Sequence, residues 1–205
     1  KARMTLIKSI SGIRGTLENI PGDSLSDIDV QQFTLAYFQE IILPRDVKLV
    51  VVGRDARKSG KKISDIVIKT LSEEGCDVID IGMLPTPLLY FSLYNLNIDN
   101  GLMITGSHNP KDYNGIKMVI NNMTLFYEHI MELYDLIMSG DFQYTDSQGS
   151  IIYNNNIIEE YIIKIKSAIH INFSATAATI FSRVSAPPPP LIISRFRLIS
   201  SAPST

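Results

Sequence analysis

Between residues 48 and 105, short apolar runs alternate with helix-like segments, and this alternation constrains the fold more than any other feature. The runs are KLVVVG (48–53), VIDIG (78–82) and GLMIT (101–105). A β-branched run that ends at a glycine or a polar loop is typical of a strand buried on both faces. Strands that are separated by helices usually pair in parallel through right-handed crossovers. We therefore predict an α/β fold.

The segments around these runs have the apolar spacing of helices. Helices are expected over 24–43, 61–74, the residues after Pro85-Thr86-Pro87, 127–138 and 157–169. Ser24 is predicted to cap the first of them, and Gly75 to stop the second. The buried side of the first helix is expected to carry Leu25, Ile28, Phe33, Ala36 and Tyr37.

A fourth apolar run, IKMVI (116–120), follows GLMIT after a loop of about ten residues. That loop is too short for a helical crossover, so these two strands are predicted to be antiparallel neighbours. The expected architecture is a mixed, mostly parallel β-sheet sandwiched between helices, with the start of a second domain. We place the first domain at 1–150 and the second at 151–205.

The composition fits a globular protein in a reducing compartment. The chain has 205 residues, 45% of them hydrophobic, which is enough to build a core. A single cysteine, Cys76, excludes an internal disulfide. It lies just before the VIDIG run, so we expect a packed thiol rather than a nucleophile.

The net charge and the hydropathy pattern exclude several partners. At a net charge of −2, neither nucleic acid nor an acidic membrane is expected to bind. No apolar run reaches the roughly 18 residues of a membrane helix. The first twelve residues, KARMTLIKSISG, lack a secretion signal, so we expect a cytoplasmic protein. Nothing in the sequence sets the oligomeric state.

The last part of the chain has a different character. Glu160 is the last acidic residue, and the later formal charges are all basic: Lys164, Lys166, Arg183, Arg195 and Arg197. The run Pro187 to Pro190 favours an extended segment without internal hydrogen bonds. We interpret residues 170–205 as a linker or irregular edge.

Four polar segments fall at the ends of expected strands or the starts of helices. They are SISGIRG (9–15), GRDARKSG (53–60), GMLPTP (82–87) and TGSHNPKDYNG (105–115). In open α/β sheets, ligands bind in the crevice at the carboxyl ends of the parallel strands. Three of the segments directly follow such strands and therefore converge on one rim. The sequence predicts a site at this rim.

GRDARKSG is not a nucleotide-binding P-loop. Six residues separate Gly53 from Gly60, and the required GK[ST] is missing. The simplest interpretation is structural, with Asp55 accepting local backbone hydrogen bonds and pairing with Arg54 or Arg57. The Pro-Thr-Pro of the third segment is most simply a helix start.

TGSHNPKDYNG contains the residues best suited to chemistry. A serine such as Ser107 becomes a nucleophile when a base lies nearby. Adjacent strand residues point to opposite faces, so His108 contacts Ser107 only if the backbone turns, which Asn109-Pro110 favours. Lys117 returns to the same rim. Taken alone, however, the Ser-His pair fits a surface turn better than a reactive centre.

Two other signals concern Arg14 and the histidines. Arg14 stands between glycines that let the backbone approach a ligand, and a guanidinium suits phosphate. A metal site is not expected from His108, His129 and His170, because they lie far apart in the sequence without close ligand spacing. A serine hydrolase is disfavoured because no G-x-S-x-G elbow is present.

Taken together and in this order, the four segments resemble the N-terminal landmarks of the α-D-phosphohexomutases. TGSHNPKDYNGIK is similar to that family's active-site pattern, T-[AG]-S-H-N-P-x-x-Y-N-G-x-K. SGIRG, GRDARKSG and the Pro-Thr-Pro loop resemble its other landmarks, and the similarity covers roughly residues 5–165. The DYNGIK ending resembles the phosphomannomutase/phosphoglucomutase branch. Phosphoglucosamine mutases usually have an aspartate where Tyr113 stands.

The resemblance implies an isomerase that moves a phosphoryl group between O1 and O6 of glucose or mannose. Ser107 would be the phosphoserine, and hexose 1,6-bisphosphate the intermediate and activator. Mg²⁺ is expected at the Ser107 phosphate, where it neutralises charge. Arg14, His108 and Lys117 would bind substrate around the transferring phosphoryl group. Either Lys117 or His108 is the candidate acid/base, and a lysine base requires a pKa lowered by burial or neighbouring cations.

The sequence departs from the family's pattern in two respects. Ser9, Ile10, Ser11 and Gly12 stand where the family usually has Phe-Gly-Thr or a Tyr-Asp pair. The D-G-D-x-D-R metal loop, the G-E-x-S-G sugar loop and the C-terminal phosphate loop do not occur in these 205 residues. We therefore expect 1–150 to carry the phosphoserine loop, and 151–205 to form a lead-in helix and an incomplete second domain.

The 205-residue chain is accordingly expected to turn over hexose phosphates poorly or not at all by itself, because the metal and sugar loops of the family are not in its sequence. A steady-state mutase assay measures this, and native-like turnover by the chain alone would contradict it. Relative rates on glucosamine 6-phosphate separate the phosphoglucosamine mutase alternative. A third alternative is a non-catalytic remnant that acts as a binding module.

Overall fold

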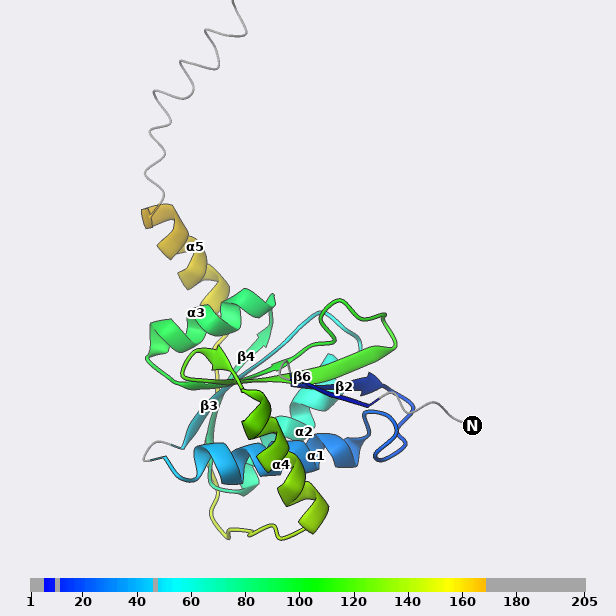
Figure 1. The fold of residues 1–205 in the computed structure, drawn as a ribbon. Helices are drawn as coiled ribbons and strands as arrows, with labels where there is room; N and C mark the ends of the chain where they lie inside the picture. Colours follow the sequence, from blue (N-terminus) through cyan, green and yellow to red (C-terminus); the bar gives the residue numbers. More distant parts are fainter. Residues whose placement is uncertain (1–5, 10–11, 46–47, 169–205) are drawn as a thin grey trace, which may run out of the picture. The chain divides into compact units, whose positions relative to one another are not determined.

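The computed structural model describes residues 6–9, 12–45 and 48–168 (Figure 1). The chain divides into two units, Lys1–Lys164 and Ile165–Thr205. The fold described here is that of the first unit. The expectations for the proline-rich tail and for His170 lie outside the described residues.

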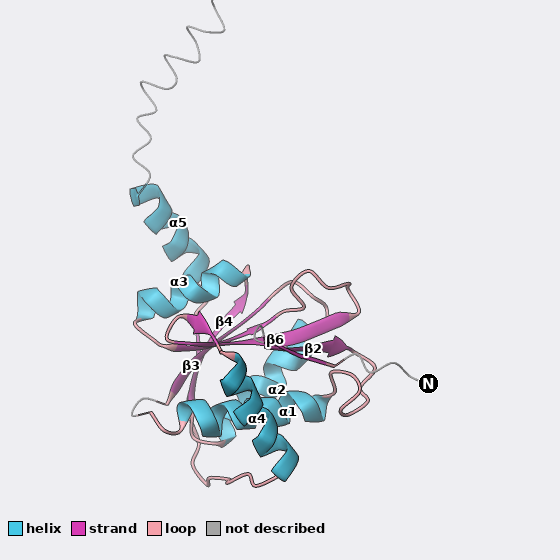
Figure 2. Ribbon diagram, viewed as in Figure 1, coloured by secondary structure: helices cyan, strands magenta, loops and turns pink. Residues whose placement is uncertain are grey.

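A mixed β-sheet forms the middle layer, and helices cover both of its faces (Figure 2). The strand order is β1-β2-β6-β5-β3-β4-β8, and β7 pairs with β6. The pairings make β1 and β6 run opposite to the other described strands. The predicted α/β class with a mostly parallel sheet is confirmed. The strands are β1 (Ile7–Ser9), β2 (Gly12–Thr16), β3 (Leu49–Arg54), β4 (Asp77–Met83), β5 (Asn100–Ile104), β6 (Tyr113–Ile120), β7 (Met123–Thr124) and β8 (Ile151–Tyr153).

The four predicted strands correspond to β3, β4, β5 and β6. β3 pairs in parallel with both β4 and β5, and β6 is antiparallel to β5, as expected from the short loop between them. β2 was not predicted, because GIRGT has no apolar alternation and becomes a strand through its pairing with β6. β8 was also missed. It adds a parallel strand beside β4, and the assignment of 151–205 to a second domain stays a prediction.

Helices α1, α2 and α4 lie on one face of the sheet and α3 lies on the other (Figure 1). A π-helical turn, η1 (Phe38–Ile42), continues α1. No helix in the described ranges combines the length and the apolar character needed to cross a membrane. The helices are α1 (Asp27–Tyr37), α2 (Gly60–Glu73), α3 (Thr86–Leu96), α4 (Tyr127–Ser139) and α5 (Ile157–Ala168).

The start of α1 differs from the expectation. Ser26 caps the helix in place of Ser24: its hydroxyl accepts the Asp29 N–H at 3.1 Å, and the Asp29 carboxylate accepts the Ser26 N–H at 3.0 Å. This reciprocal pair is a capping box. Ile28 is 52% exposed rather than buried, because it lies opposite the apolar stripe of the helix. That stripe includes Val30, Phe33, Ala36 and Tyr37, which are all buried.

Cys76 is a packed thiol, as predicted. It is buried between α2 and β4, and burial raises the pKa of its thiol to about 12. A thiolate is the reactive form of cysteine, so this residue is kept unreactive near neutral pH.

The fully buried Tyr37 side chain joins α1 to the sheet through its hydroxyl group. Its hydroxyl donates to the Val119 carbonyl in β6 at 2.7 Å. Burial raises the pKa of this phenol, so the hydroxyl keeps its proton and remains a donor.

We predict that Tyr37→Phe lowers the free energy of unfolding by about 1–2 kcal/mol, because the Val119 carbonyl loses a buried donor. The matched control is Tyr94→Phe, since Tyr94 is 76% exposed and its hydroxyl can bond to water in either state. Urea unfolding of both variants measures the difference. Equal midpoints for the two variants would refute the role given to the Tyr37 hydroxyl.

Candidate active site

The polar segments that follow β3, β4 and β5 meet at one rim of the sheet. The Asp55 N–H donates to the Ile104 carbonyl, and the Leu84 N–H donates to the Arg54 carbonyl, both at 2.9 Å. These bonds connect the three segments immediately beyond the strand ends. The predicted convergence of GRDARKSG, GMLPTP and TGSHNPKDYNG is therefore confirmed. Pro85 directly precedes α3, as expected for a helix start.

Ser107 lies at a sharp turn just beyond β5, with its side chain exposed. Its φ is 54°, a left-handed conformation that is uncommon outside glycine. The turn brings His108 Nδ1 to 3.4 Å from Ser107 Oγ. The sequence placed the necessary turn at Asn109-Pro110, whereas the left-handed residue is Ser107 itself.

Arg57 and Asp55 support this turn. Arg57, rather than Arg54, is the partner of Asp55, with Nε 3.3 Å from Oδ2. The guanidinium also donates to main-chain carbonyls of the serine loop, which we define as residues 105–112 together with the first residue of β6, Tyr113. The sequence interpretation recognised the ion pair but missed the contacts with the loop. Residues fifty or more positions apart meet here, and no local pattern reports that.

Arg14 reaches the same rim from β2. It is opposite Gly115 of β6, where a Cβ atom would lie 2.6 Å from Arg14 Cγ. Glycine at this position therefore leaves the space that the arginine stem occupies. Burial, and the neighbouring Arg57 guanidinium, lower the pKa of Arg14. Two guanidinium groups close to each other make this rim attractive for an anion.

Lys117 lies on β6, two residues beyond Gly115. Gly115 pairs with Arg14, and alternate residues of a strand share a face, so the side chains of Lys117 and Arg14 lie on the same face of the sheet. This is the face that α3 covers. The Lys117 ammonium lies 5.3 Å from the centroid of the Tyr90 ring on α3, a cation–π distance. Tyr90 is a second contact that sequence reasoning missed, because it depends on how α3 packs on the sheet.

The two histidines that the structure describes lie in different segments, and His108 is in the serine loop. His129 lies on α4, where its Nδ1 accepts the Phe126 N–H at 3.3 Å, and His170 lies outside the described residues. Among the described residues there is no group of three or more His, Cys, Asp or Glu side chains that could hold a metal ion.

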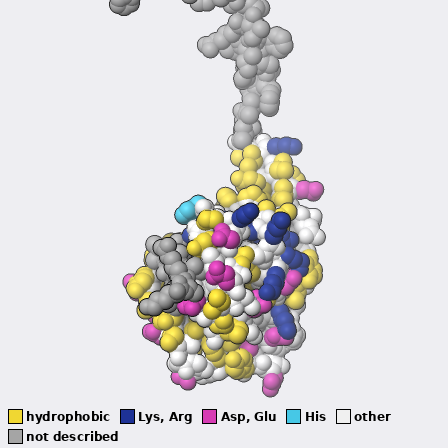
Figure 3. Space-filling view, turned by 90° about the vertical axis from the view of Figure 1, so that its right-hand side faces the viewer, with side chains coloured by type: hydrophobic (Ala, Val, Ile, Leu, Met, Phe, Trp, Pro, Cys, Tyr) yellow, Lys and Arg dark blue, Asp and Glu magenta, His cyan; other side chains and the backbone are white. Residues whose placement is uncertain are grey.

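The exposed lysines of α2 do not extend the site. They are paired with acids: Lys61 with Asp65, Lys62 with Asp27 at 2.7 Å, and Lys69 with Glu73 at 3.7 Å. In the view of Figure 3, Lys and Arg side chains lie mainly along one side, with Asp and Glu side chains between them.

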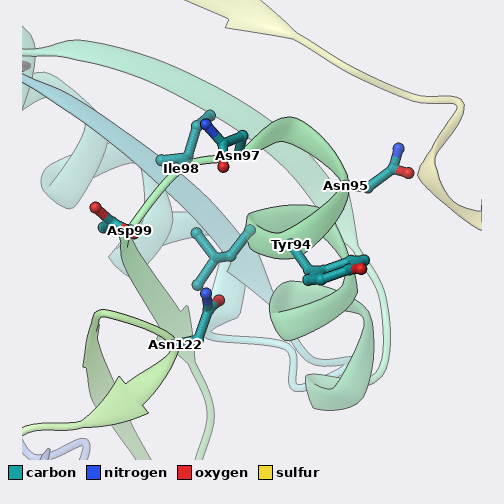
Figure 4. A pocket seen from close by; sticks show the side chains of 7 residues that line it. Tyr94, Asn95, Asn97, Ile98, Asp99 and Asn122 are labelled. Atoms are coloured by element: carbon teal, nitrogen blue, oxygen red, sulfur yellow. The ribbon is translucent and has the colours of Figure 1, made fainter.

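A pocket of about 330 Å³ lies at the C-terminal end of α3, close to the start of β5 (Figure 4). It is thus at the opposite end of β5 from Ser107. Its lining is mainly amide, carboxylate and apolar: Leu93, Tyr94, Asn95, Asn97, Ile98, Asp99 and Asn122. It contains none of the candidate site residues.

Several curated proteins are similar to this chain in sequence. Phosphomannomutase/phosphoglucomutase of Pseudomonas syringae pv. tomato is 44% identical over 120 residues, which are 58% of this chain and 25% of that protein. Phosphoglucomutase of Neisseria gonorrhoeae is 34% identical over 166 residues, 78% of this chain and 35% of that protein. The chain thus matches about a quarter to a third of the length of these curated relatives.

The fold and the family profile agree with these sequence matches. A crystal structure of a phosphoglucomutase/phosphomannomutase family protein from Burkholderia thailandensis superposes with a TM-score of 0.68 at 30% identity, covering 81% of this chain and 37% of that one. Residues 7–144 match the family profile described as phosphoglucomutase/phosphomannomutase, alpha/beta/alpha domain I. With the serine loop, the Arg14 strand and the Asp55–Arg57 segment all inside the matched range, this chain belongs to the phosphoglucomutase/phosphomannomutase family and carries its α/β/α domain I.

Proposed function

We propose that this domain carries the phosphoserine of a phosphohexomutase that interconverts hexose 1-phosphate and hexose 6-phosphate, with glucose or mannose as the sugar. The observation that carries the proposal is the exposed Ser107 hydroxyl, held at the rim of the sheet with His108 Nδ1 at 3.4 Å. Ser107 Oγ attacks a phosphorus of hexose 1,6-bisphosphate, and the bond from that phosphorus to the sugar oxygen breaks. The serine proton leaves, and the sugar oxygen gains a proton. In the reverse direction, phosphorylated Ser107 donates its phosphoryl group to the free O1 or O6 hydroxyl of a hexose monophosphate.

Arg14, His108 and Lys117 are the polar groups that we assign to this transfer. Arg14 suits the phosphate, because a guanidinium binds phosphate oxygens in a bidentate way. His108 is close enough to Ser107 Oγ to exchange a proton with it. Lys117 is the other candidate acid/base, and its ammonium lies over the Tyr90 ring. All three are also proposed to bind the substrate.

Mg²⁺ is the cofactor that we propose, with the Ser107 phosphate as its ligand in this domain. A divalent cation neutralises the charge of a transferring phosphoryl group, and Mg²⁺ prefers hard oxygen donors. Both carboxylate oxygens of Asp55 are already engaged by Arg57 and Thr105. We therefore assign the oxygen of Ser107, rather than Asp55, as the ligand at this rim. The steps assigned above use the protein's own groups.

We propose the complete mutase reaction only for a protein that also contains the regions of the relatives that this sequence does not match. The matched segments are 25% and 35% of the two relatives' lengths. The low turnover expected for the 205-residue chain alone stays a prediction, as does a cytoplasmic location.

We predict that incubation with glucose 1,6-bisphosphate and Mg²⁺ adds one phosphoryl group to the chain, and that Ser107→Ala abolishes this addition. The reason is that the alanine has no oxygen to form the new bond. Intact-mass analysis with peptide mapping measures it. Ser139→Ala, at the exposed end of α4, is the matched control and should leave the labelling unchanged. A wild-type chain that is never labelled would favour the binding-module alternative, whereas label that persists in Ser107→Ala would contradict Ser107 as the acceptor.

Tyr90→Leu is predicted to slow phosphorylation of Ser107 by roughly twofold to fivefold, because Lys117 loses a cation–π contact. Tyr90→Phe keeps the ring and should retain the wild-type rate. The rate of phosphoryl incorporation, followed by mass at several pH values, measures both variants. Equal slowing in Tyr90→Phe would assign the effect to the tyrosine hydroxyl and contradict the ring's role.

A further inference from the structure

All five N–H donors of the Arg57 guanidinium are used inside the protein. An arginine side chain has five such donors in a fixed planar arrangement. The acceptors are Asp55 Oδ2 at 3.3 Å and the carbonyls of Pro110 at 2.6 Å, Tyr113 at 2.8 Å, Ser107 at 3.0 Å and Asn109 at 2.7 Å. The side chain is only 15% exposed. Arg57 therefore has no donor left for a ligand.

Four of these acceptors are main-chain carbonyls of the serine loop. One side chain thus spans the whole turn and donates to carbonyls from Ser107 to Tyr113. Hydrogen bonds from a charged donor are stronger than neutral ones. A lysine could not replace this arrangement, because its three donors radiate from a single nitrogen.

Asp55 holds Arg57 and the loop at the same time. Its Oδ1 accepts the Arg57 N–H at 3.0 Å, and its Oδ2 accepts the Thr105 hydroxyl at 2.8 Å. Thr105 Oγ1 in turn accepts the Ser107 N–H at 2.9 Å. The Ser107 backbone is therefore fixed from both sides, at its N–H through Thr105 and at its carbonyl through Arg57.

This double attachment explains how Ser107 keeps its left-handed backbone. A non-glycine residue at φ 54° is strained and persists only where the surroundings hold it. The preceding residue, Gly106, supports the same arrangement. A Cβ atom there would lie 2.6 Å from Arg57 Cζ, so any side chain would displace the guanidinium.

We infer that Arg57, backed by Asp55, is a positioning residue for Ser107. It fixes the serine loop in one conformation without touching the substrate, and so increases the rate at which the Ser107 hydroxyl accepts a phosphoryl group. The rate effect rests on the function proposed above, whereas the effect on the loop does not.

The first experiment measures the loop without any substrate. Amide hydrogen exchange of the full chain should show the peptide over 105–115 exchanging roughly tenfold faster in Arg57→Ala and in Arg57→Lys than in the wild type. Exchange in β3 and β5 should not change. Lys58→Ala, which removes the next and exposed cation, is the matched control and should behave as the wild type.

The second experiment measures phosphoryl incorporation into Ser107 as a function of hexose 1,6-bisphosphate concentration. Arg57→Ala should lower the saturating rate by roughly tenfold or more, because the hydroxyl is no longer held for attack. The concentration at half-saturation should stay within about twofold, because Arg57 makes no contact with substrate. Methylguanidinium in the buffer should restore part of the rate and of the exchange protection in Arg57→Ala, with methylurea as the uncharged control.

The outcomes separate the two proposals. A wild-type exchange pattern in Arg57→Ala overturns the inference, as does a variant that changes only the half-saturating concentration. If the wild type is never phosphorylated, the proposed function fails while the exchange experiment still decides the role of Arg57. If Arg57→Ala does not fold, Gly106→Ala decides instead: it keeps the charge, displaces the guanidinium, and should reproduce the faster loop exchange, whereas wild-type exchange in that variant overturns the inference.

Discussion

Strands β3 and β5 pair in parallel with Arg54 opposite Ile104, so the residues that follow them, Asp55 and Thr105, leave the sheet side by side. The Asp55 carboxylate then accepts the Thr105 hydroxyl, and the segment after β3 comes to support the segment after β5. Because the two strands are neighbours through a crossover, residues about fifty positions apart become one unit. The rest of the candidate site is built on this register.

The second consequence concerns charge. Arg57 follows β3 and donates to the serine loop with all its donors occupied, while Arg14 reaches the same rim from β2 with its stem packed over Gly115. The two cations have different tasks although both are arginines. A guanidinium whose donors are all used by carbonyls stabilises the backbone, whereas the one beside it remains available to an anion. The family's phosphoryl chemistry fits a rim where one arginine holds the backbone and the other can bind an anion. GRDARKSG is not a P-loop.

Local patterns predicted most of the elements correctly, and the failures have physical causes. β3, β4 and β5 were found because β-branched runs ending at polar residues are a local signal of a buried strand. β2 was missed, because GIRGT becomes a strand only by pairing with β6. Ser26 displaced Ser24 as the cap, because the capping box also needs Asp29 in the first turn. At the site, the sequence singled out Ser107, His108, Lys117 and Arg14, but it located neither the Arg57–loop contacts nor the Tyr90–Lys117 contact.

The sequence by itself determined the alternation of β3, β4 and β5 with helices, the rim on which the polar segments converge, and the family to which the serine motif belongs. These follow from periodicity and from short motifs, which depend on neighbouring residues. Only the tertiary structure decided that Arg57 is the partner of Asp55, that it binds four carbonyls of the serine loop, and that Ser107 takes a left-handed backbone. Those features depend on hydrogen bonds between residues that the chain brings together only when the parallel sheet has formed.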